Sequence, residues 1–292
     1  METRPFGSTG ADFPILSFGA QRIVDEHNCS EEQAIKILNE ALDQGVRYFD
    51  TAWIYSYGQS EERVGKVAQH RRQEMWIATK AWDRTRDGAL RQLDDSLARL
   101  RTDHVDEWRL HNVWSIDELD KCFARDGAIL AMIEAREQGM VRYASISGHT
   151  DPQVQIEALR RFPFDSVLIA ASVLDHFVYS FVEQFLPVAH AKGVATIAMK
   201  VFALGKLEHV YEKALRYTLG LPVSTTIVGC STMDQLRRDL QIAKDFVPLN
   251  AAERLELFRE VLPLVTPANV PWKADDWNHP SAWNQPVHPR TD

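Results

Sequence analysis

The stretch ILSFGAQRIVDEHNCSEEQAIKILNEALDQGVRYFDTA (residues 15–52) decides the fold. It opens with a short apolar run, continues with apolar residues at helical spacing, and closes with a second short run rich in β-branched and aromatic residues. Ser30 is followed three residues later by Gln33, a pair that can satisfy the free backbone amides at the start of a helix. The stretch therefore predicts a strand, a helix and a second strand, which is the repeating unit of parallel sheets.

This unit repeats about eight times along the chain. Further helix starts are predicted at Ser115 and Thr232, which also have Glu or Gln three residues later, and at Asp151, which is followed by a proline. The expected strands are residues 15–20, 46–52, 75–81, 105–111, 141–147, 165–171, 194–200 and 224–229. Eight alternating strands and helices suit a closed (β/α)8 barrel, the TIM barrel.

The two ends of the chain depart from the repeat. Residues 4–14 contain a Gly-flanked turn between apolar residues and predict a small hairpin that closes the bottom of the barrel. Residues 249–262 predict an additional amphipathic helix, so we expect residues 1–265 to form a single barrel domain. Residues 266–292 hold five prolines and three tryptophans without periodicity, and predict an irregular tail. The tail could cover the barrel mouth, pack on the outside or contact another subunit, and we expect it to pack on the outside.

Composition excludes several functional classes. A formal charge of −8 and a pI near 5.7 argue against broad binding to nucleic acid or to anionic membranes, which usually requires a basic face. The three cysteines have no CxxC spacing, so neither a disulfide framework nor a metal site is expected. No apolar run approaches the ~20 residues that span a bilayer, and no secretory leader is recognisable. We therefore expect a cytoplasmic protein without a metal, whose oligomeric state the sequence leaves open.

Four polar residues stand at or just beyond the ends of predicted strands, where barrel enzymes place their reactive groups. They are Asp50, Tyr55, Lys80 and His111. Each has a structural alternative, since Asp and Lys form buried ion pairs, Tyr packs its ring, and His satisfies core hydrogen bonds. Together they suit proton transfer: Lys80 would lower the pKa of the Tyr55 phenol, Asp50 would orient Lys80, and His111 would donate to a carbonyl oxygen.

The motifs around these residues resemble the aldo-keto reductase family. The resemblance rests on GVRYFDTAWIYSYGQSEERVGK (residues 45–66), ATK (78–80), LH (110–111), SISGH (145–149), GKL (205–207) and IVGCSTMDQL (227–236), and it extends from about Arg4 to Leu249. It implies a (β/α)8 barrel and hydride transfer from NAD(P)H to an aldehyde or ketone. It also implies that Tyr55 is the general acid, that Lys80 and Asp50 tune it, and that His111 orients the carbonyl.

The same resemblance implies a dinucleotide site over the ends of the seventh and eighth strands. The residues expected to contact the cofactor are Asp50, Ser147, Met199, Lys200, Gly205, Gly229, Ser231, Gln235 and Asp239. Ser231 and Thr232 could equally be helix caps, and His149 is expected to be an exposed loop residue. Gly229 and Gln235 stand where relatives often carry the basic residue that holds a 2′-phosphate, and Arg237 or Arg238 could substitute. Family habit favours NADPH as the cofactor, with NADH as an alternative.

Three tryptophans follow strand ends near the predicted site. Trp53, Trp82 and Trp114 predict a pocket for an apolar or aromatic carbonyl substrate, although packing against neighbouring loops would also explain them. Two alternatives keep the same fold: a sugar or alcohol dehydrogenase that works in the oxidative direction, and a nucleotide-binding regulatory subunit. The complete set of four catalytic candidates argues against the regulatory reading.

Overall fold

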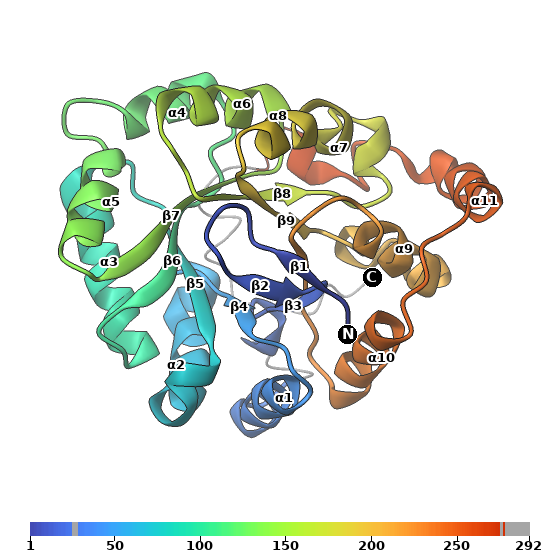
Figure 1. Cartoon of the computed structure of the whole chain (residues 1–292), viewed down its shortest axis with the longest axis horizontal. Coiled ribbons are helices and arrows are strands. Elements are labelled where there is room, and N and C mark those ends of the chain that lie inside the picture. Colours follow the sequence, from blue (N-terminus) through green and yellow to red (C-terminus); the bar gives the residue numbers. More distant parts are fainter. Residues whose placement is uncertain (25–28, 275–276, 278–292) are drawn as a thin grey trace.

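Eight parallel strands close into a barrel in the computed structural model, which describes residues 1–24, 29–274 and 277 (Figure 1). The strands stand in the closed order β10-β3-β4-β5-β6-β7-β8-β9. Their bounds are β3 Leu16–Gly19, β4 Tyr48–Asp50, β5 Trp76–Ala81, β6 Val105–Leu110, β7 Val141–Gly148, β8 Ser166–Ala170, β9 Ala195–Met199 and β10 Thr225–Val228. All eight lie where the sequence predicts strands, and the (β/α)8 fold is confirmed.

Helices surround the barrel and begin where the sequence places their caps. Ser30, Ser115, Asp151 and Thr232 each accept a backbone hydrogen bond at a helix start, and Thr232 forms a complete capping box with Gln235. The helices are α1 Glu31–Asp43, α2 Gln59–Arg71, α3 Arg86–Leu100, α4 Ile116–Cys122, α5 Ala128–Glu137, α6 Pro152–Arg161, α7 Phe181–Gln184, α8 Leu186–Ala191, α9 Tyr211–Leu219, α10 Met233–Lys244 and α11 Ala251–Val261. The extra amphipathic helix predicted after the eighth unit is α11.

The predicted hairpin closes one end of the barrel. Strands β1 (Thr3–Pro5) and β2 (Asp12–Pro14) pair antiparallel and lie across the barrel in Figure 1. Phe13 packs edge-on against Phe6, Tyr48 and Trp76, and Phe6 also packs edge-on against Trp76. These aromatic rings seal the barrel floor, so reactive groups have access to solvent only at the opposite end.

The described part of the tail corrects the expectation of outside packing. Trp272, in the short 3-10 helix Pro271–Lys273, is fully buried, and its indole donates to Asp175 Oδ1 at 2.8 Å. Thr150 Oγ1 donates to the Trp272 carbonyl at 3.0 Å, which ties the tail to the loop after β7. Trp277 packs with its ring centroid 5.3 Å from that of His149. This segment therefore lies at the barrel mouth; residues 275–276 and 278–292 fall outside the described residues.

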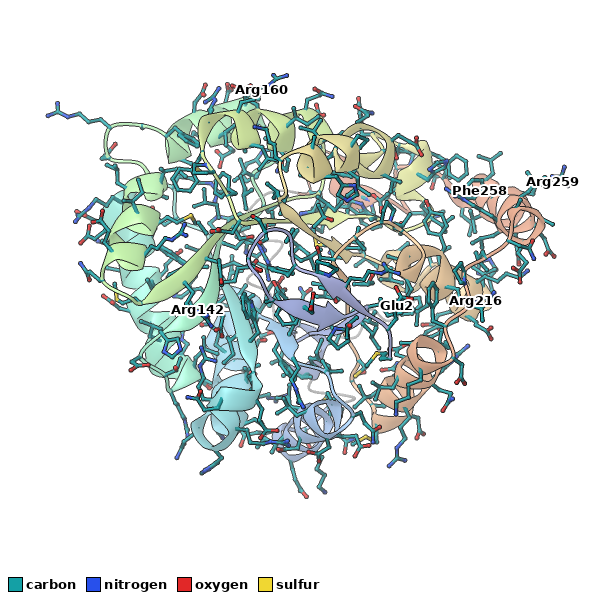
Figure 2. The ribbon with its side chains drawn as sticks, viewed as in Figure 1. Glu2, Arg142, Arg160, Arg216, Phe258 and Arg259 are labelled. Carbon is teal, nitrogen blue, oxygen red and sulfur yellow. The ribbon has the colours of Figure 1, made fainter. Side chains whose placement is uncertain are left out.

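Many charged side chains lie on the outer surface of the molecule. Charged side chains such as Arg160 and Arg259 stand at the outer edge in Figure 2. None of the described helices is both long enough and apolar enough to cross a membrane. The described residues contain no cluster of three or more His, Cys, Asp or Glu side chains that could hold a metal ion.

Candidate active site

The four predicted catalytic residues converge at the open end of the barrel. Asp50 ends β4, Lys80 lies near the end of β5, and His111 directly follows β6. Tyr55 begins a tight turn after β4, and all four side chains are buried. The carboxyl ends of neighbouring parallel strands meet at one edge, which explains why residues 61 positions apart in the chain form one cluster.

The turn that presents Tyr55 has an unusual backbone. Ser56 and Tyr57 adopt positive φ angles of 47° and 55°, and Gly58 follows with a φ of 91°. Residues other than glycine adopt this region at a cost of about 1 kcal/mol or more each, and such strain concentrates at functional sites. The turn leaves the Tyr55 ring buried and the Tyr57 ring exposed.

Lys80 is the hub of the cluster. Its ammonium nitrogen donates to Asp50 Oδ1 at 2.5 Å, to the Thr51 carbonyl at 2.6 Å and to the Tyr55 hydroxyl at 3.2 Å. An ammonium group has three donors, so these contacts use all of them and fix its position. Because the Tyr55 oxygen accepts a hydrogen bond from Lys80, the phenolic proton is left to point elsewhere.

Charge and burial set the protonation states. Burial, with a smaller contribution from the Asp50 carboxylate, raises the pKa of Tyr55 well above the usual value for a phenol. The net change is thus upward rather than the predicted lowering, because removal of the phenolate from water outweighs the lowering effect of the Arg109 charge. Burial also lowers the pKa of Lys80 to about 8, against the opposing effect of Asp50. Tyr55 is therefore protonated at neutral pH, and Lys80 is mostly charged.

His111 is held as a neutral ring between two aromatic side chains. Burial first, and the Lys80 charge second, lower its pKa well below the usual value for histidine. Its ring meets Tyr55 edge-on at 5.6 Å between centroids and Trp82 at 5.3 Å. A neutral imidazole donates one ring hydrogen bond, which is the role that the sequence assigns to it.

Two further charged residues below the site were missed by the sequence reasoning. Arg109 Nη1 donates to Asp50 Oδ2 at 2.5 Å, and Arg109 also pairs with Glu107. Both side chains are fully buried within β6. A signal was present, since Glu107, Arg109 and His111 stand at alternate positions and must share the inward face of that strand.

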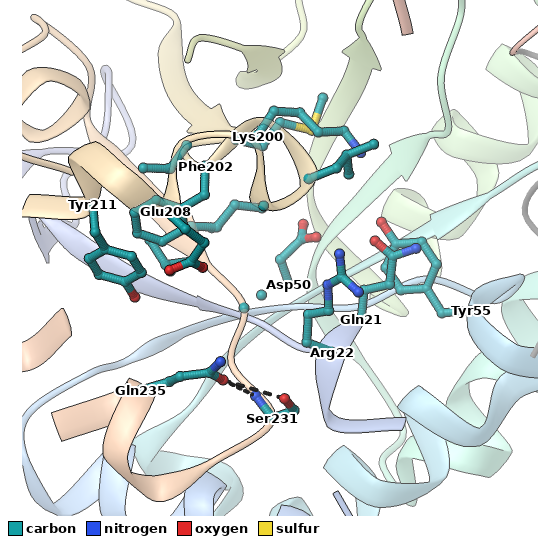
Figure 3. A pocket seen from close by; sticks show the side chains of 18 of the residues that line it. Gln21, Arg22, Asp50, Tyr55, Lys200, Phe202, Glu208, Tyr211, Ser231 and Gln235 are labelled. Atoms are coloured by element: carbon teal, nitrogen blue, oxygen red, sulfur yellow. Dashed lines mark hydrogen bonds between the residues drawn. The ribbon is translucent and has the colours of Figure 1, made fainter. Parts of the chain in front are cut away.

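A cavity of about 350 Å³, here called the mouth cavity, opens above Asp50 and Tyr55 (Figure 3). It extends over the ends of β9, β10 and β3 towards Glu208 and Tyr211. The predicted cofactor residues that line it are Asp50, Met199, Lys200, Gly205, Gly229, Ser231 and Gln235. Most of the predicted cofactor set therefore surrounds one cavity that also contains the Tyr55 ring.

Ser147 and Asp239 are not among the residues that line the mouth cavity. The Ser147 hydroxyl accepts a hydrogen bond from the backbone N–H of Asn112 at 2.8 Å and donates to the Leu110 carbonyl at 3.3 Å. Ser147 therefore fixes the loop after β6. Asp239 is buried and accepts from the Tyr211 hydroxyl at 2.6 Å. Asp239 thus supports Tyr211, which does line the cavity.

His149 is buried and lines the mouth cavity, so the expectation of an exposed loop histidine was wrong. Its Nδ1 lies 2.7 Å from Asn112 Oδ1. The tail causes the difference, because Trp277 packs against the His149 ring from a position more than a hundred residues later. Burial lowers the pKa of His149 well below its usual value, so the ring is neutral.

The cavity also has residues that the sequence reasoning did not name. Gln21 and Arg22 line it from the loop after β3, and Phe202, Glu208 and Tyr211 line it from the segment after β9. Phe202 stacks on Tyr211 with centroids 4.0 Å apart. Arg238 on α10, which the sequence suggested as a substitute basic residue, does not line the cavity, but its guanidinium lies 3.8 Å from the centroid of the Tyr211 ring. No motif distinguishes these residues, because their proximity depends on loop paths.

The predicted substrate tryptophans lie around the tetrad. Trp53 and Trp82, together with Trp277, pack against the small cluster of Ala52, Ile54 and Tyr55. Trp114 lies one ring further out, 6.2 Å from Trp82 between centroids. The aromatic side chains therefore gather beside the Tyr55 ring.

Comparison with known proteins identifies the family. The family model described as Aldo/keto reductase family matches residues 15–216, more than half of the chain. The chain belongs to the aldo/keto reductase family. YqkF of Bacillus subtilis, described as an uncharacterized oxidoreductase, is 27% identical over 294 residues that cover 83% of this chain and 91% of the relative. The L-galactose dehydrogenase of Arabidopsis thaliana is 24% identical over 315 residues, or 93% of this chain and 97% of that enzyme.

Solved structures of the family agree with the fold. The holo form of aldo-keto reductase AKR11C1 from Bacillus halodurans has a TM-score of 0.75 at 27% identity, over 89% of this chain and 96% of that one. An aldo/keto reductase from Klebsiella pneumoniae, solved with NADP and acetate, has a TM-score of 0.74 at 18% identity, over 89% and 95% of the two chains. This aldo/keto reductase is therefore an NAD(P)H-dependent oxidoreductase, of a family that acts on small carbonyl compounds.

The residues that line the mouth cavity are chemically suited to part of a nicotinamide dinucleotide. One end holds the Tyr55 phenol, and the other holds the start of α10, where Ser231 and Gln235 lie. The dipole at the start of a helix favours phosphate groups, although the backbone amides of Ser231 and Thr232 already donate to the Gln235 side chain. A Cβ atom at Gly229 would lie 2.8 Å from the Gly19 carbonyl oxygen. Glycine is therefore needed here, where two backbone segments approach closely at this end of the cavity.

Proposed function

We propose that this aldo/keto reductase reduces an aldehyde or ketone to an alcohol, with Tyr55 as the proton donor. The observation that carries the proposal is the 3.2 Å hydrogen bond from Lys80 to the Tyr55 hydroxyl, at a point where Tyr55 lines the mouth cavity. Lys80 occupies an acceptor position of the phenolic oxygen, so the proton on Tyr55 is available for a substrate oxygen. The high pKa of Tyr55 keeps that proton in place until the reaction needs it.

The reduced nicotinamide, when bound, supplies the hydride that adds to the carbonyl carbon. Negative charge then develops on the carbonyl oxygen, which takes the Tyr55 proton and becomes the alcohol hydroxyl. The Lys80 ammonium, held by Asp50, stabilises the phenolate that Tyr55 becomes. Neutral His111 donates a hydrogen bond to the same carbonyl oxygen and sets its direction.

The proposed cofactor is NADPH, with NADH as the alternative. Arg22, Lys200 and the start of α10 place positive charge along the mouth cavity, and Arg238 lies just behind Tyr211. Gly229 and Gln235 leave their positions without the basic side chain that relatives often carry. Equal affinity for the two nucleotides in a binding titration would contradict a preference for NADPH.

The proposed substrate is an apolar or aromatic carbonyl compound. Trp53, Trp82 and Trp277 pack around the Tyr55 cluster, and rings beside the proton donor favour a flat or apolar substrate. A panel of aliphatic, aromatic and sugar aldehydes tests this part of the proposal. Much better turnover of small polar sugars would contradict it.

An oxidative role is the second candidate. Two relatives are named as dehydrogenases of sugars: the L-galactose dehydrogenase already mentioned and a D-threo-aldose 1-dehydrogenase from Pseudomonas sp, 27% identical over 237 residues. Tyr55 would then act as the base that removes the alcohol proton, by microscopic reversibility. Initial rates in both directions with NADP⁺ and NADPH decide between the two candidates.

The test of the reaction is the Tyr55→Phe variant, which removes only the hydroxyl group. We expect the rate of NADPH oxidation with an aldehyde to fall by about 10²–10⁴-fold, the usual contribution of a general acid, with nucleotide affinity unchanged. Tyr57→Phe is the matched control, because that ring is 62% exposed and two residues away. A Tyr55→Phe enzyme as active as the Tyr57→Phe enzyme would disprove the role of Tyr55.

A further inference from the structure

A row of alternating charges continues below the active site into the barrel. Lys80 binds one oxygen of Asp50, Arg109 binds the other, and Glu107 binds Arg109 from the far side. All four residues are at least 98% buried. Proteins seldom bury charged groups without compensation, because each loses several kcal/mol of hydration, on the order of the stability of a whole domain.

Arg109 is held on every side. Its Nε donates to Ser145 Oγ at 2.9 Å, its Nη1 to Asp50 Oδ2 at 2.5 Å, and its Nη2 to the Tyr48 hydroxyl at 2.8 Å. These partners come from β4 and β7, on either side of β6. Glu107 is itself bound by the Ser166 hydroxyl at 2.8 Å. The guanidinium is therefore held in one position inside the barrel, between Asp50 and the end that the hairpin closes.

The geometry divides the Asp50 carboxylate between two cations. Its Oδ1 faces Lys80 and its Oδ2 faces Arg109, each at 2.5 Å. A carboxylate held at one oxygen can rotate about its terminal bond, whereas one held at both oxygens cannot. The orientation of Asp50, and with it the position of the Lys80 ammonium beneath the Tyr55 hydroxyl, depends on Arg109.

We propose that Arg109 is a positioning residue of this active site: by holding Asp50 from below, it fixes Lys80 under Tyr55 and weakens the hold of Asp50 on the Lys80 charge. Its effect on turnover rests on the proposed reduction. The electrostatics agree, because Arg109 opposes the charged form of Lys80 more strongly than Glu107 favours it.

The protonation equilibrium of Lys80 depends on the titratable and charged groups around it. Asp50 and Tyr55 face it from β4 and the turn that follows, and Arg109, Glu107 and His111 face it from β6. The charge of Lys80 is also felt at His149, beyond β7. His111 and His149 are neutral, and Tyr55 stays protonated, so Asp50, Glu107 and Arg109 are the charges that move the Lys80 equilibrium.

The test is the double variant Glu107→Gln/Arg109→Met, which removes one charge of each sign and leaves the barrel interior without an unpaired ion. The first readout is the ionisation midpoint of Lys80, followed by NMR of ¹³C-labelled lysine and assigned with Lys80→Arg. We expect the midpoint, about 8 in the wild type, to move to higher pH in the double variant. The second readout is kcat across the same pH range, where we expect a fall of up to about 10²-fold at neutral pH, the scale of a 1 Å misplacement.

Two single variants separate charge from geometry. Arg109→Lys keeps the positive charge but cannot bridge Asp50 and Glu107, so the Lys80 midpoint should stay near that of the wild type while kcat falls. Arg142→Met is the matched control, since that arginine lies on β7 with a side chain 56% exposed, and neither readout should change. Thermal unfolding of each variant confirms that it is folded.

The outcomes are distinct. A higher Lys80 midpoint in the double variant, with an unmoved midpoint in Arg109→Lys, supports the proposal. An unmoved midpoint in a folded double variant overturns it, and a lower kcat alone would then reflect general destabilisation. If the wild type reduces no carbonyl compound, the proposed function fails, and the NMR midpoint still decides what Arg109 does to Lys80.

Discussion

On the β4–β6 side of the barrel mouth, Asp50, Lys80 and Arg109 hold one another through short ionic contacts, whereas the β9–β10 side is built from Gly205, Gly229 and stacked rings around an open cavity. The first side is already fixed without any ligand, because each charge has its partner in the protein. The second side leaves space and offers the positive end of the α10 dipole and a few cations. If the proposed reaction is correct, the groups proposed to react are held in place before any ligand binds, and the cofactor proposed to bind beside them is accommodated mainly by the shape of the cavity.

The largest test of this contrast is Asp50→Asn. The change leaves two buried cations facing a neutral amide, so we expect the free energy of unfolding to fall by about 3–5 kcal/mol and turnover to be nearly lost. Urea unfolding and NADPH oxidation rates measure the two effects. Asp103→Asn is the control, because that side chain is 95% exposed and should change stability little. A stable, active Asp50→Asn enzyme would show that the charged side is not interlocked.

The pH dependence of kcat tests the same side of the barrel mouth without a substitution. The pKa of Lys80 is about 8, so kcat should fall as the pH rises through that value, while Tyr55 stays protonated. Unfolding would not explain such a fall. The pKa of a lysine in the unfolded chain is about 10.4, so above the folded-state value the unfolded chain binds the Lys80 proton more tightly than the folded chain does. The Lys80 contribution to stability therefore increases between the two values. A Lys80→Met enzyme should have low activity without this alkaline limb. A flat wild-type profile from pH 7 to 10 would contradict the role of Lys80.

Glu208→Gln tests the open side. The Glu208 carboxylate lines the mouth cavity near Tyr211 and repels a phosphate, so its neutralisation should raise the preference for NADPH over NADH by roughly 3- to 10-fold. Dissociation constants for both nucleotides measure this. Glu212→Gln, on α9 with a side chain 65% exposed, is the control. An unchanged ratio would mean that Glu208 lies away from the nucleotide phosphates.

The smallest expected effect is that of Trp277→Ala. Loss of one ring beside the Tyr55 cluster should raise KM for aromatic aldehydes about 5-fold, equal to roughly 1 kcal/mol of aromatic contact, with little change in kcat. Aliphatic aldehydes serve as the internal comparison. Equal effects on both classes would place Trp277 outside the substrate site.

The sequence predicted the parts of the molecule that depend on local pattern. The eight strands follow from apolar runs, the helix starts from capping residues, and the tetrad candidates from polar residues at strand ends. The polar residues of the SEERVG motif (residues 60–65) have structural contacts: Ser60 donates to the Ala20 carbonyl at 2.8 Å, and Glu61 accepts from Thr79.

The parts that the sequence did not predict depend on contacts across the fold. The proposed role of Arg109 depends on a contact inside the barrel with Asp50 of β4, two strands away from β6. His149 is buried where Trp277, 128 residues later, packs against its ring. The net direction of the Tyr55 pKa differs from the predicted lowering because burial, which no motif expresses, outweighs the effect of the Arg109 charge.

The pairing of β10 with β3 brings Thr226 opposite Leu16, two segments from opposite ends of the barrel sequence. During synthesis on the ribosome, the first strands and the tetrad therefore emerge long before the strand that completes the sheet. Until then, β3 presents an open edge and the charges beneath Tyr55 lack their full enclosure. Trp272 is synthesised later still, so its hydrogen bond to Asp175 at the barrel mouth can form only after the strands are complete. The nascent enzyme would thus have no finished site until almost all of the described chain has been made.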